Sequence, residues 1–151
     1  MISAAHFILD VRDQEASRRF WEQGLGLPPA LHVPGMTEFR LREGVVLGLM
    51  PERGIRALLG ERLPDPAAAA GVPRAELYLL VDDPAESLAR CLRAGASLLS
   101  EVLPRSRGHR AGYCLDPDGH VIAFASVGTG TRRALVSPEG RPRRAGPRPG
   151  G

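Results

Sequence analysis

The chain contains an internal repeat that limits the folds open to it. The stretch HFILDVRD at residues 6–13 has the same layout as ELYLLVDD at residues 76–83, with His6 aligned to Glu76 and an aspartate at the end of both. Self-similarity of this kind indicates that one supersecondary unit is present twice. The repeat therefore predicts two modules of the same architecture.

Hydrophobic spacing and turn residues predict the same elements in each copy. Alternating apolar residues are typical of strands, and apolar residues three or four apart are typical of helices. Asp13 and Asp83 are the expected N-caps of two helices, and Ala16 and Phe20 are expected on the buried side of the first. The predicted elements are, in chain order, strand 6–12, helix 14–24, strands 30–33, 36–42 and 45–50, helix 52–63, strand 76–82, a helix from residue 84 to about 94, and strands 97–103, 111–115 and 120–126.

The last hairpins of the two copies also correspond. Gly44 is followed by VVLGLM and Gly119 by HVIAFA, so Gly48 aligns with Ala123. Each copy is therefore predicted to be a βαβββ unit. The expected organisation is one domain over residues 1–127, with module one at about 1–50, a linker helix and loop at 51–74, and module two at about 75–127.

The basic charge of the chain is concentrated near its end. Residues 132–151 hold six arginines and one acidic residue, whereas residues 1–131 hold 14 arginines and 16 acidic residues. The segment 128–151, rich in Arg, Pro and Gly, is predicted to be a disordered tail. No nucleic-acid partner is expected, because the predicted domain lacks a face of clustered basic and aromatic side chains.

Composition is typical of a soluble globular protein. With 151 residues, 43% of them hydrophobic, the chain can bury a core. The sequence shows no signal peptide and no apolar run of about 20 residues, so we expect a cytoplasmic protein with no membrane partner. Cys91 and Cys114 are expected to be small buried side chains, since two cysteines make no disulfide framework.

Two longer motifs carry a family resemblance. HFILDVRDQEASRRFWEQGLGL at residues 6–27 and GYCLDPDGHVIAFA at residues 112–125 resemble the first strand and helix and the final hairpin of the vicinal oxygen chelate superfamily. That superfamily includes glyoxalase I, extradiol dioxygenases, fosfomycin-resistance enzymes and bleomycin-resistance binding proteins, and the resemblance covers about residues 5–127. It implies an α+β fold of two tandem βαβββ modules, with curved mixed sheets around a concave cavity, helices on the outside, and dimerisation as a frequent feature.

The resemblance also implies where metal-dependent members hold their metal. The four positions are His6, Gly48, Glu76 and Ala123, of which Gly48 and Ala123 have no donor atom in the side chain. Divalent metals in proteins take three or four protein donors, so we expect no tightly bound metal and no other cofactor. The alternative keeps a divalent metal on His6 and Glu76, completed by Glu38, His120 or the substrate.

The expected function is the binding of a small organic ligand, in the manner of the drug-sequestering binders. Strand alternation sends one set of side chains into the concave face. The alternatives are a metal-dependent lyase, isomerase, thiol transferase or dioxygenase, and a metal-free enzyme that uses His6 and Glu76 as an acid/base pair for proton transfer. His120 is expected to be a surface histidine at the entrance of the last strand. The predicted ligand-binding residues are His6, Ile8, Asp10, Glu38, Arg40, Gly48, Met50, Glu76, Tyr78 and Ala123.

Overall fold

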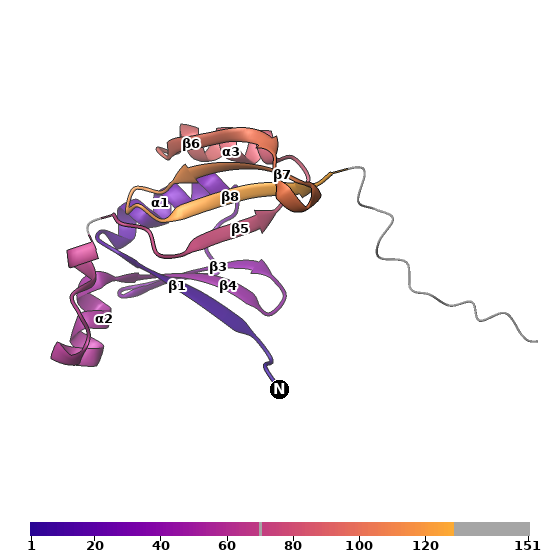
Figure 1. Ribbon diagram of the computed structural model, residues 1–151. Coiled ribbons are helices and arrows are strands. Elements are labelled where there is room, and N and C mark those ends of the chain that lie inside the picture. Colours follow the sequence, from indigo (N-terminus) through magenta and orange to yellow (C-terminus); the bar gives the residue numbers. More distant parts are fainter. Residues whose placement is uncertain (70, 129–151) are drawn as a thin grey trace, which may run out of the picture.

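The first half of the computed structural model is a four-stranded mixed sheet with one helix (Figure 1). The structure describes residues 1–69 and 71–128. The strand order is β1-β4-β3-β2, with β1 parallel to β4 and the other pairs antiparallel. The elements of this module are β1 (Ala5–Val11), α1 (Gln14–Leu25), β2 (Leu31–Val33), β3 (Met36–Arg42) and β4 (Val45–Pro51).

The second half repeats this arrangement. Its sheet has the order β5-β8-β7-β6, again with the first strand parallel to the last. The elements are β5 (Glu76–Leu80), α3 (Pro84–Arg93), β6 (Ser97–Pro104), β7 (His109–Leu115) and β8 (Val121–Val127). The linker between the modules holds α2 (Glu52–Leu59) and short 3₁₀ turns at Gly60–Arg62 and Pro66–Ala69. The predicted α+β fold of two βαβββ modules is confirmed.

The hydrogen-bond register confirms the repeat at the level of single residues. Ile8 lies opposite Gly48 where β1 pairs with β4. Tyr78 lies opposite Ala123 where β5 pairs with β8. The two parallel pairs, each at one edge of its sheet, therefore have the same register, and the alignment of Gly48 with Ala123 is correct.

Both long helices begin where the sequence predicts. The side chain of Asp13 accepts a hydrogen bond from the backbone N–H of Ala16 at 2.9 Å, and Asp83 accepts one from Glu86 at 3.0 Å. Each bond satisfies one of the backbone donors left free at the start of a helix. Gly26 ends α1 in the left-handed conformation, with φ of 67°, which glycine adopts without steric cost.

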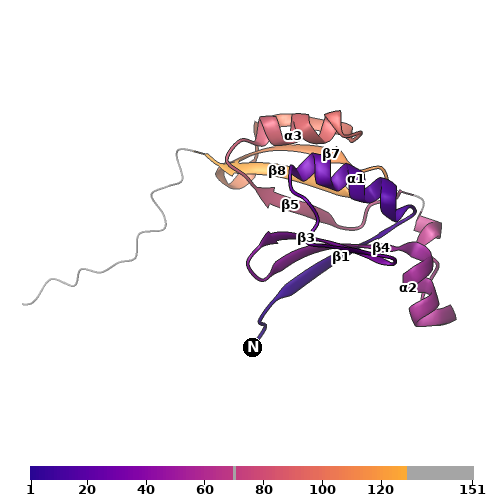
Figure 2. The ribbon, with the colours of Figure 1, turned by 180° about the vertical axis from the view of Figure 1, so that it is seen from behind.

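The two helices pack against each other and join the modules (Figure 2). A Cβ atom added to Gly24 of α1 would lie 2.8 Å from Sγ of Cys91 in α3, so the helices approach as closely as glycine permits. Arg90 of α3 donates a hydrogen bond to the carbonyl oxygen of Leu25 at 3.1 Å. Both modules contribute to one core, made of Leu9, Val11, Phe20, Trp21, Phe39, Leu47, Leu49, Leu88, Cys91, Cys114, Ile122 and Phe124.

Two local expectations are wrong. The helix predicted over residues 52–63 ends at Leu59, because Gly60 leaves the helical conformation with φ of 68° and ψ of −158°. Leu58, near the end of this helix, is 70% exposed. On α1 the buried stripe runs through Ser17 and Phe20, and Ala16 is exposed.

Two further predictions concern membranes and the C-terminal tail. No helix among them is long and apolar enough to cross a bilayer. The predicted disordered tail lies, from residue 129 onward, outside the described residues.

The contact between α3 and β7 leads to a stability prediction. A Cβ atom on Gly112 of β7 would lie 2.8 Å from Cδ2 of Leu88 and 2.9 Å from Cγ2 of Val102. Overpacking a buried site typically costs about 1–3 kcal/mol. We therefore expect Gly112→Ala to lower the free energy of unfolding by about that amount, measured by urea titration.

Gly54→Ala is the matched control. Its new Cβ would meet its nearest atom, Cγ of Met50, at an ordinary 3.7 Å, and alanine is favoured over glycine within a helix. Its stability should equal or exceed that of the wild type. Equal stability of Gly112→Ala and the wild type would show that α3 does not press on β7 as described.

Candidate functional site

The predicted ligand-binding residues lie on the faces of the two sheets that point away from the helices, the open faces, although Gly48 and Ala123 are themselves buried there. Leu9 and Val11 belong to the buried core that also contains residues of α1, whereas Ile8, on the other side of β1, is 45% exposed. Cross-strand neighbours share a face, and the register groups the predicted residues accordingly. The open face of the first sheet carries His6, Ile8, Asp10, Glu38, Arg40, Gly48 and Met50, and that of the second carries Glu76, Tyr78 and Ala123.

The polar contacts described on these faces join other residues than the predicted pair of His6 and Glu76. Nδ1 of His6 lies 3.6 Å from Oε1 of Glu38, within the first sheet. Glu76 belongs to the second sheet, where the hydroxyl of Tyr78 and Nδ1 of His109 are 2.9 Å apart. The proton-transferring pair of His6 and Glu76 therefore stays a prediction.

The four superfamily metal positions do not make a donor set that fits a metal. A Cβ atom on Gly48 would lie 3.0 Å from Cγ1 of Ile8 and 3.5 Å from Sδ of Met36, so apolar atoms occupy this position. Ala123 is fully buried and has no donor. Among the described residues, no group of three or more His, Cys, Asp or Glu side chains is arranged to hold a metal ion.

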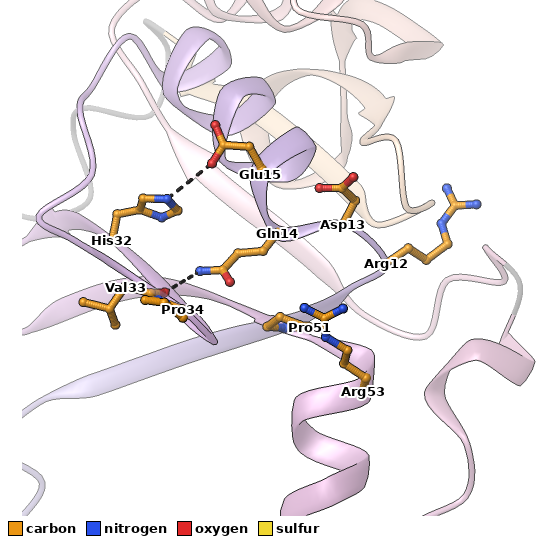
Figure 3. A pocket seen from close by; sticks show the side chains of 9 residues that line it. All are labelled: Arg12, Asp13, Gln14, Glu15, His32, Val33, Pro34, Pro51 and Arg53. Carbon is orange, nitrogen blue, oxygen red and sulfur yellow. Dashed lines mark hydrogen bonds and ion pairs between the residues drawn. The ribbon is translucent and has the colours of Figure 1, made fainter.

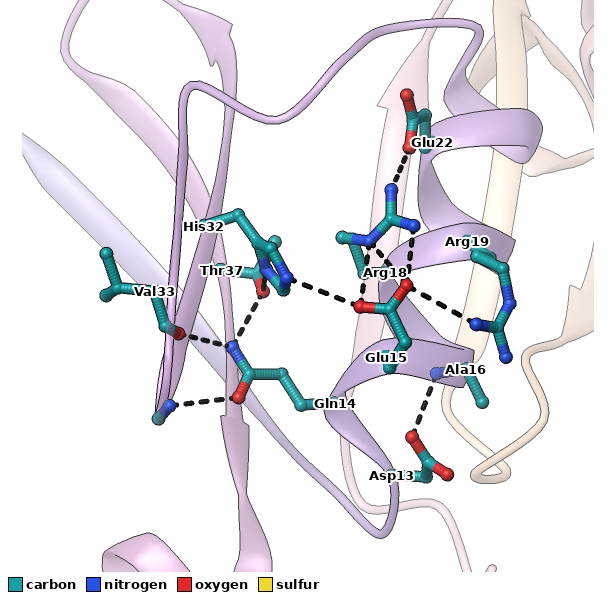
Figure 4. Close-up of polar contacts among 11 residues, drawn as sticks. Asp13, Gln14, Glu15, Ala16, Arg18, Arg19, Glu22, His32, Val33 and Thr37 are labelled. Atoms are coloured by element: carbon teal, nitrogen blue, oxygen red, sulfur yellow. Dashed lines mark hydrogen bonds and ion pairs between the residues drawn. The ribbon is translucent and has the colours of Figure 1, made fainter.

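A cavity of about 450 Å³ lies at the start of α1 (Figure 3). Gln14, Glu15 and His32 among its polar side chains are already engaged in contacts within the first module (Figure 4). Nε2 of Gln14 donates to the carbonyl oxygen of Val33 at 2.8 Å and to Oγ1 of Thr37 at 3.0 Å. His32 lies between Oγ1 of Thr37 and the carboxylate of Glu15, at 2.8 and 3.3 Å. These contacts tie α1 to the β2–β3 hairpin, so we read this cavity as structural.

A larger cavity, of about 820 Å³, lies between the two modules. Its walls come from β1, the linker, and the turn between β7 and β8. The backbone N–H and Nε of Arg12 both donate to Oδ1 of Asp118, at 3.1 and 3.0 Å, which joins the end of β1 to that turn. The lining residues include the apolar Phe7, Ile8, Leu9, Leu63, Val72 and Leu115 and the polar Asp10, Arg12, Glu52, Asp116, Asp118 and His120.

An aspartate–histidine pair forms part of this wall. Oδ2 of Asp116 accepts a hydrogen bond from Nδ1 of His120 at 2.9 Å. Oδ1 of Asp116 accepts from the backbone N–H groups of Asp118 and His120, at 3.0 and 2.7 Å. The side chain of Asp116 is fully buried and that of His120 is 29% exposed. The turn thus holds the imidazole in a fixed orientation at the cavity.

The cavity shifts the pKa of several groups. Burial raises the pKa of Asp10, partly offset by the charge of His120. Burial, followed by the charge of Asp118, raises the pKa of Glu52. For His120 burial acts downward, but the hydrogen bond and charge of Asp116, with the charges of Asp118 and Asp10, together raise the pKa above its ordinary value.

Two of the predicted ligand-binding residues, Ile8 and Asp10, line this cavity. The other eight line neither of the two cavities, and their binding role stays a prediction. The expectation that His120 is a surface histidine is wrong, because the buried carboxylate of Asp116 holds it against the wall. The stretch DPDGH carried a signal for this pair, since an aspartate bonds readily to groups that follow it across a tight turn.

Comparison with known proteins assigns the class and then the family. The architecture of paired βαβββ modules is that of the vicinal oxygen chelate superfamily. Residues 6–125 match the family described as Glyoxalase-like domain, which is most of the chain. The chain belongs to this glyoxalase-like family.

Solved structures agree with this assignment. A glyoxalase-related enzyme from Fulvimarina pelagi is similar, with 26% identity, a TM-score of 0.71, and coverage of 83% of this chain and 88% of that chain. A glyoxalase/bleomycin resistance protein/dioxygenase from Nocardioides shares the fold at 22% identity and a TM-score of 0.66, covering 97% of this chain and 89% of its own. The comparison with curated proteins gives no match.

The Asp116–His120 pair predicts a pH-dependent stability. Because the pKa of His120 is raised in the folded protein, its contribution is fully present below the ordinary value of 6.5 and is lost as the pH rises through the folded value. Asp116→Asn keeps an acceptor for the turn but removes the charge. We expect it to lower the free energy of unfolding by about 1–3 kcal/mol near pH 6, with a smaller loss at higher pH.

Urea titrations over a series of pH values measure the gap, which is the difference in free energy of unfolding between the wild type and the variant. Asp83→Asn is the control, because asparagine caps a helix about as well as aspartate does, and the described structure pairs Asp83 with no histidine. Its gap should be small at every pH. A gap for Asp116→Asn that does not change with pH would contradict the described role of His120.

Proposed function

We propose that this protein binds a small, largely apolar organic molecule in the cavity between its modules. The observation that supports this proposal is the larger cavity itself. Its volume of about 820 Å³ falls within the roughly 300–1,000 Å³ usual for small-molecule sites. Most of its wall is apolar, and a few fixed polar groups, such as Asp10 and His120, are placed to orient a ligand.

Comparison supports a small-molecule role. The structural neighbours include proteins named for glyoxalase, bleomycin resistance and dioxygenase, and these names concern small organic molecules. The predicted binding residues Ile8 and Asp10 belong to the cavity, which agrees with a site at the junction of the modules. Self-association and a cytoplasmic location stay predictions.

We further propose that no metal is tightly bound. The support lies in the chemistry of the superfamily positions: two of the four have no donor, and the remaining two, His6 and Glu76, belong to different sheets. The alternative of a metal-dependent enzyme requires a third donor close to both. Glu38 lies close to His6, but among the described residues no third His, Cys, Asp or Glu joins these two in a group that could hold a metal ion.

Metal content tests this part of the proposal. Protein purified without chelator should hold substoichiometric Mn²⁺, Fe²⁺, Ni²⁺ and Zn²⁺ by elemental analysis. Adding each ion should leave the thermal midpoint unchanged, because two donors do not hold a divalent ion firmly. A stoichiometric ion, or a rise in midpoint that His6→Ala abolishes, would make the metal-dependent alternative the correct one.

Blocking the cavity tests the binding site. We expect a fragment screen by saturation-transfer NMR to yield ligands whose affinity falls at least about tenfold in Val72→Trp, since the larger ring takes up space at the wall. Leu58→Trp is the matched control, because Leu58 is also an exposed aliphatic residue of the linker, 70% exposed, and does not line the cavity. Ligands that bind both variants equally well would place the site elsewhere.

A further inference from the structure

The Asp116–His120 pair has the geometry of a positioned base. A carboxylate oxygen can only accept, so the 2.9 Å contact between Oδ2 and Nδ1 places a proton on Nδ1. This leaves Nε2 as the nitrogen that gains and loses a proton. Because Oδ1 of Asp116 is held by two backbone N–H groups, neither the carboxylate nor the ring is free to turn away.

The second nitrogen has no competing partner. Among residues 1–69 and 71–128, none forms a hydrogen bond with Nε2 of His120, and the residue lines the larger cavity. Ile8, Leu115 and Val72 supply apolar surface in the same wall. The side chain of His120 is 29% exposed, so the wall shields the ring from water in part, which strengthens its interaction with a bound molecule.

The charged groups around His120 come from both modules. Asp116 and Asp118 belong to its own turn, and Asp10 reaches the cavity from β1. Arg12 is paired with Asp118, and its positive charge offsets part of the effect of that carboxylate on His120. Burial lowers the pKa of the ring, but the hydrogen bond and charge of Asp116, with the charges of Asp118 and Asp10, outweigh it, so the ring is a stronger base than a free histidine.

We propose that His120, positioned by Asp116, acts as a general base on molecules bound in this cavity. The inference rests on the proposed binding site and adds a chemical class to it: compact, largely apolar molecules that carry one weakly acidic C–H or O–H bond. That bond breaks, its electron pair stays on the bound molecule, and the proton passes to Nε2. The proton then returns to the product or to water, so no oxidant, reductant or metal takes part in the step.

The test uses 5-nitrobenzisoxazole as the probe. A base removes its single ring-carbon proton, the N–O bond breaks, and a coloured cyanonitrophenolate forms, which absorbance follows directly. General-base catalysis typically contributes about 10²–10⁴-fold, so we expect His120→Gln to lower kcat/KM by at least about 10²-fold. His109→Gln is the matched control, since His109 lies outside the cavity, and it should keep the wild-type rate.

The pH profile separates the base from its positioning residue. In the wild type the rate should rise with pH through the pKa of His120, above the ordinary 6.5, and then level off. Asp116→Asn should move this midpoint to lower pH and reduce the plateau. The midpoint must also coincide with an NMR titration of the His120 ring in the wild-type protein, a measurement that does not depend on any variant folding.

A binding measurement distinguishes the two ways in which the inference can fail. 5-Nitroindazole has the shape of the probe but cannot open, so its affinity reports the cavity alone. If it binds and Val72→Trp weakens it, but ring opening is equally fast in His120→Gln, the base assignment is wrong and the binding site stands. If it does not bind and the probe is not opened, both proposals are wrong.

Discussion

The packing of α1 against α3 is the contact on which the rest of the structure depends. Gly24 and Cys91 bring the helices close, and Arg90 adds a hydrogen bond to the end of α1. Large side chains such as Trp21 are then fully buried between the modules. A single core therefore stabilises both sheets from their helix-covered sides, and their other faces stay open at the surface.

The larger cavity follows from this placement. Once the helices are docked, the end of β1 lies beside the turn between β7 and β8, and Arg12 bonds to Asp118 across the junction. The linker between the modules forms the third side of the cavity. A Cβ atom on Gly119 would lie 2.6 Å from Cα of Gly71, so turn and linker are in close contact, and the φ of 91° at Gly119 also requires glycine. Side chains from all three segments meet in one space.

The elements were predictable because each depends on nearby residues. Alternation identified the strands, and the caps at Asp13 and Asp83 identified the helix starts. The site was predictable only in part. Ile8 and Asp10 of the predicted set line the cavity, and so do Glu52, which was not singled out, and His120, which was expected at the surface. Hydrophobic spacing in the linker indicates a helix but not where that helix and the following loop lie, so their share of the wall had to come from the structure.

The sequence by itself determined the two βαβββ modules, the residues on each strand face, and the loss of donors at two superfamily metal positions. The modules and the strand faces follow from local spacing, whereas the metal positions are known only through the resemblance to the superfamily. Only the tertiary structure decided how the modules dock and which side chains share a cavity. The reason is that docking depends on contacts such as that between Arg90 and Leu25, which are 65 residues apart, and on close approaches that no local pattern records.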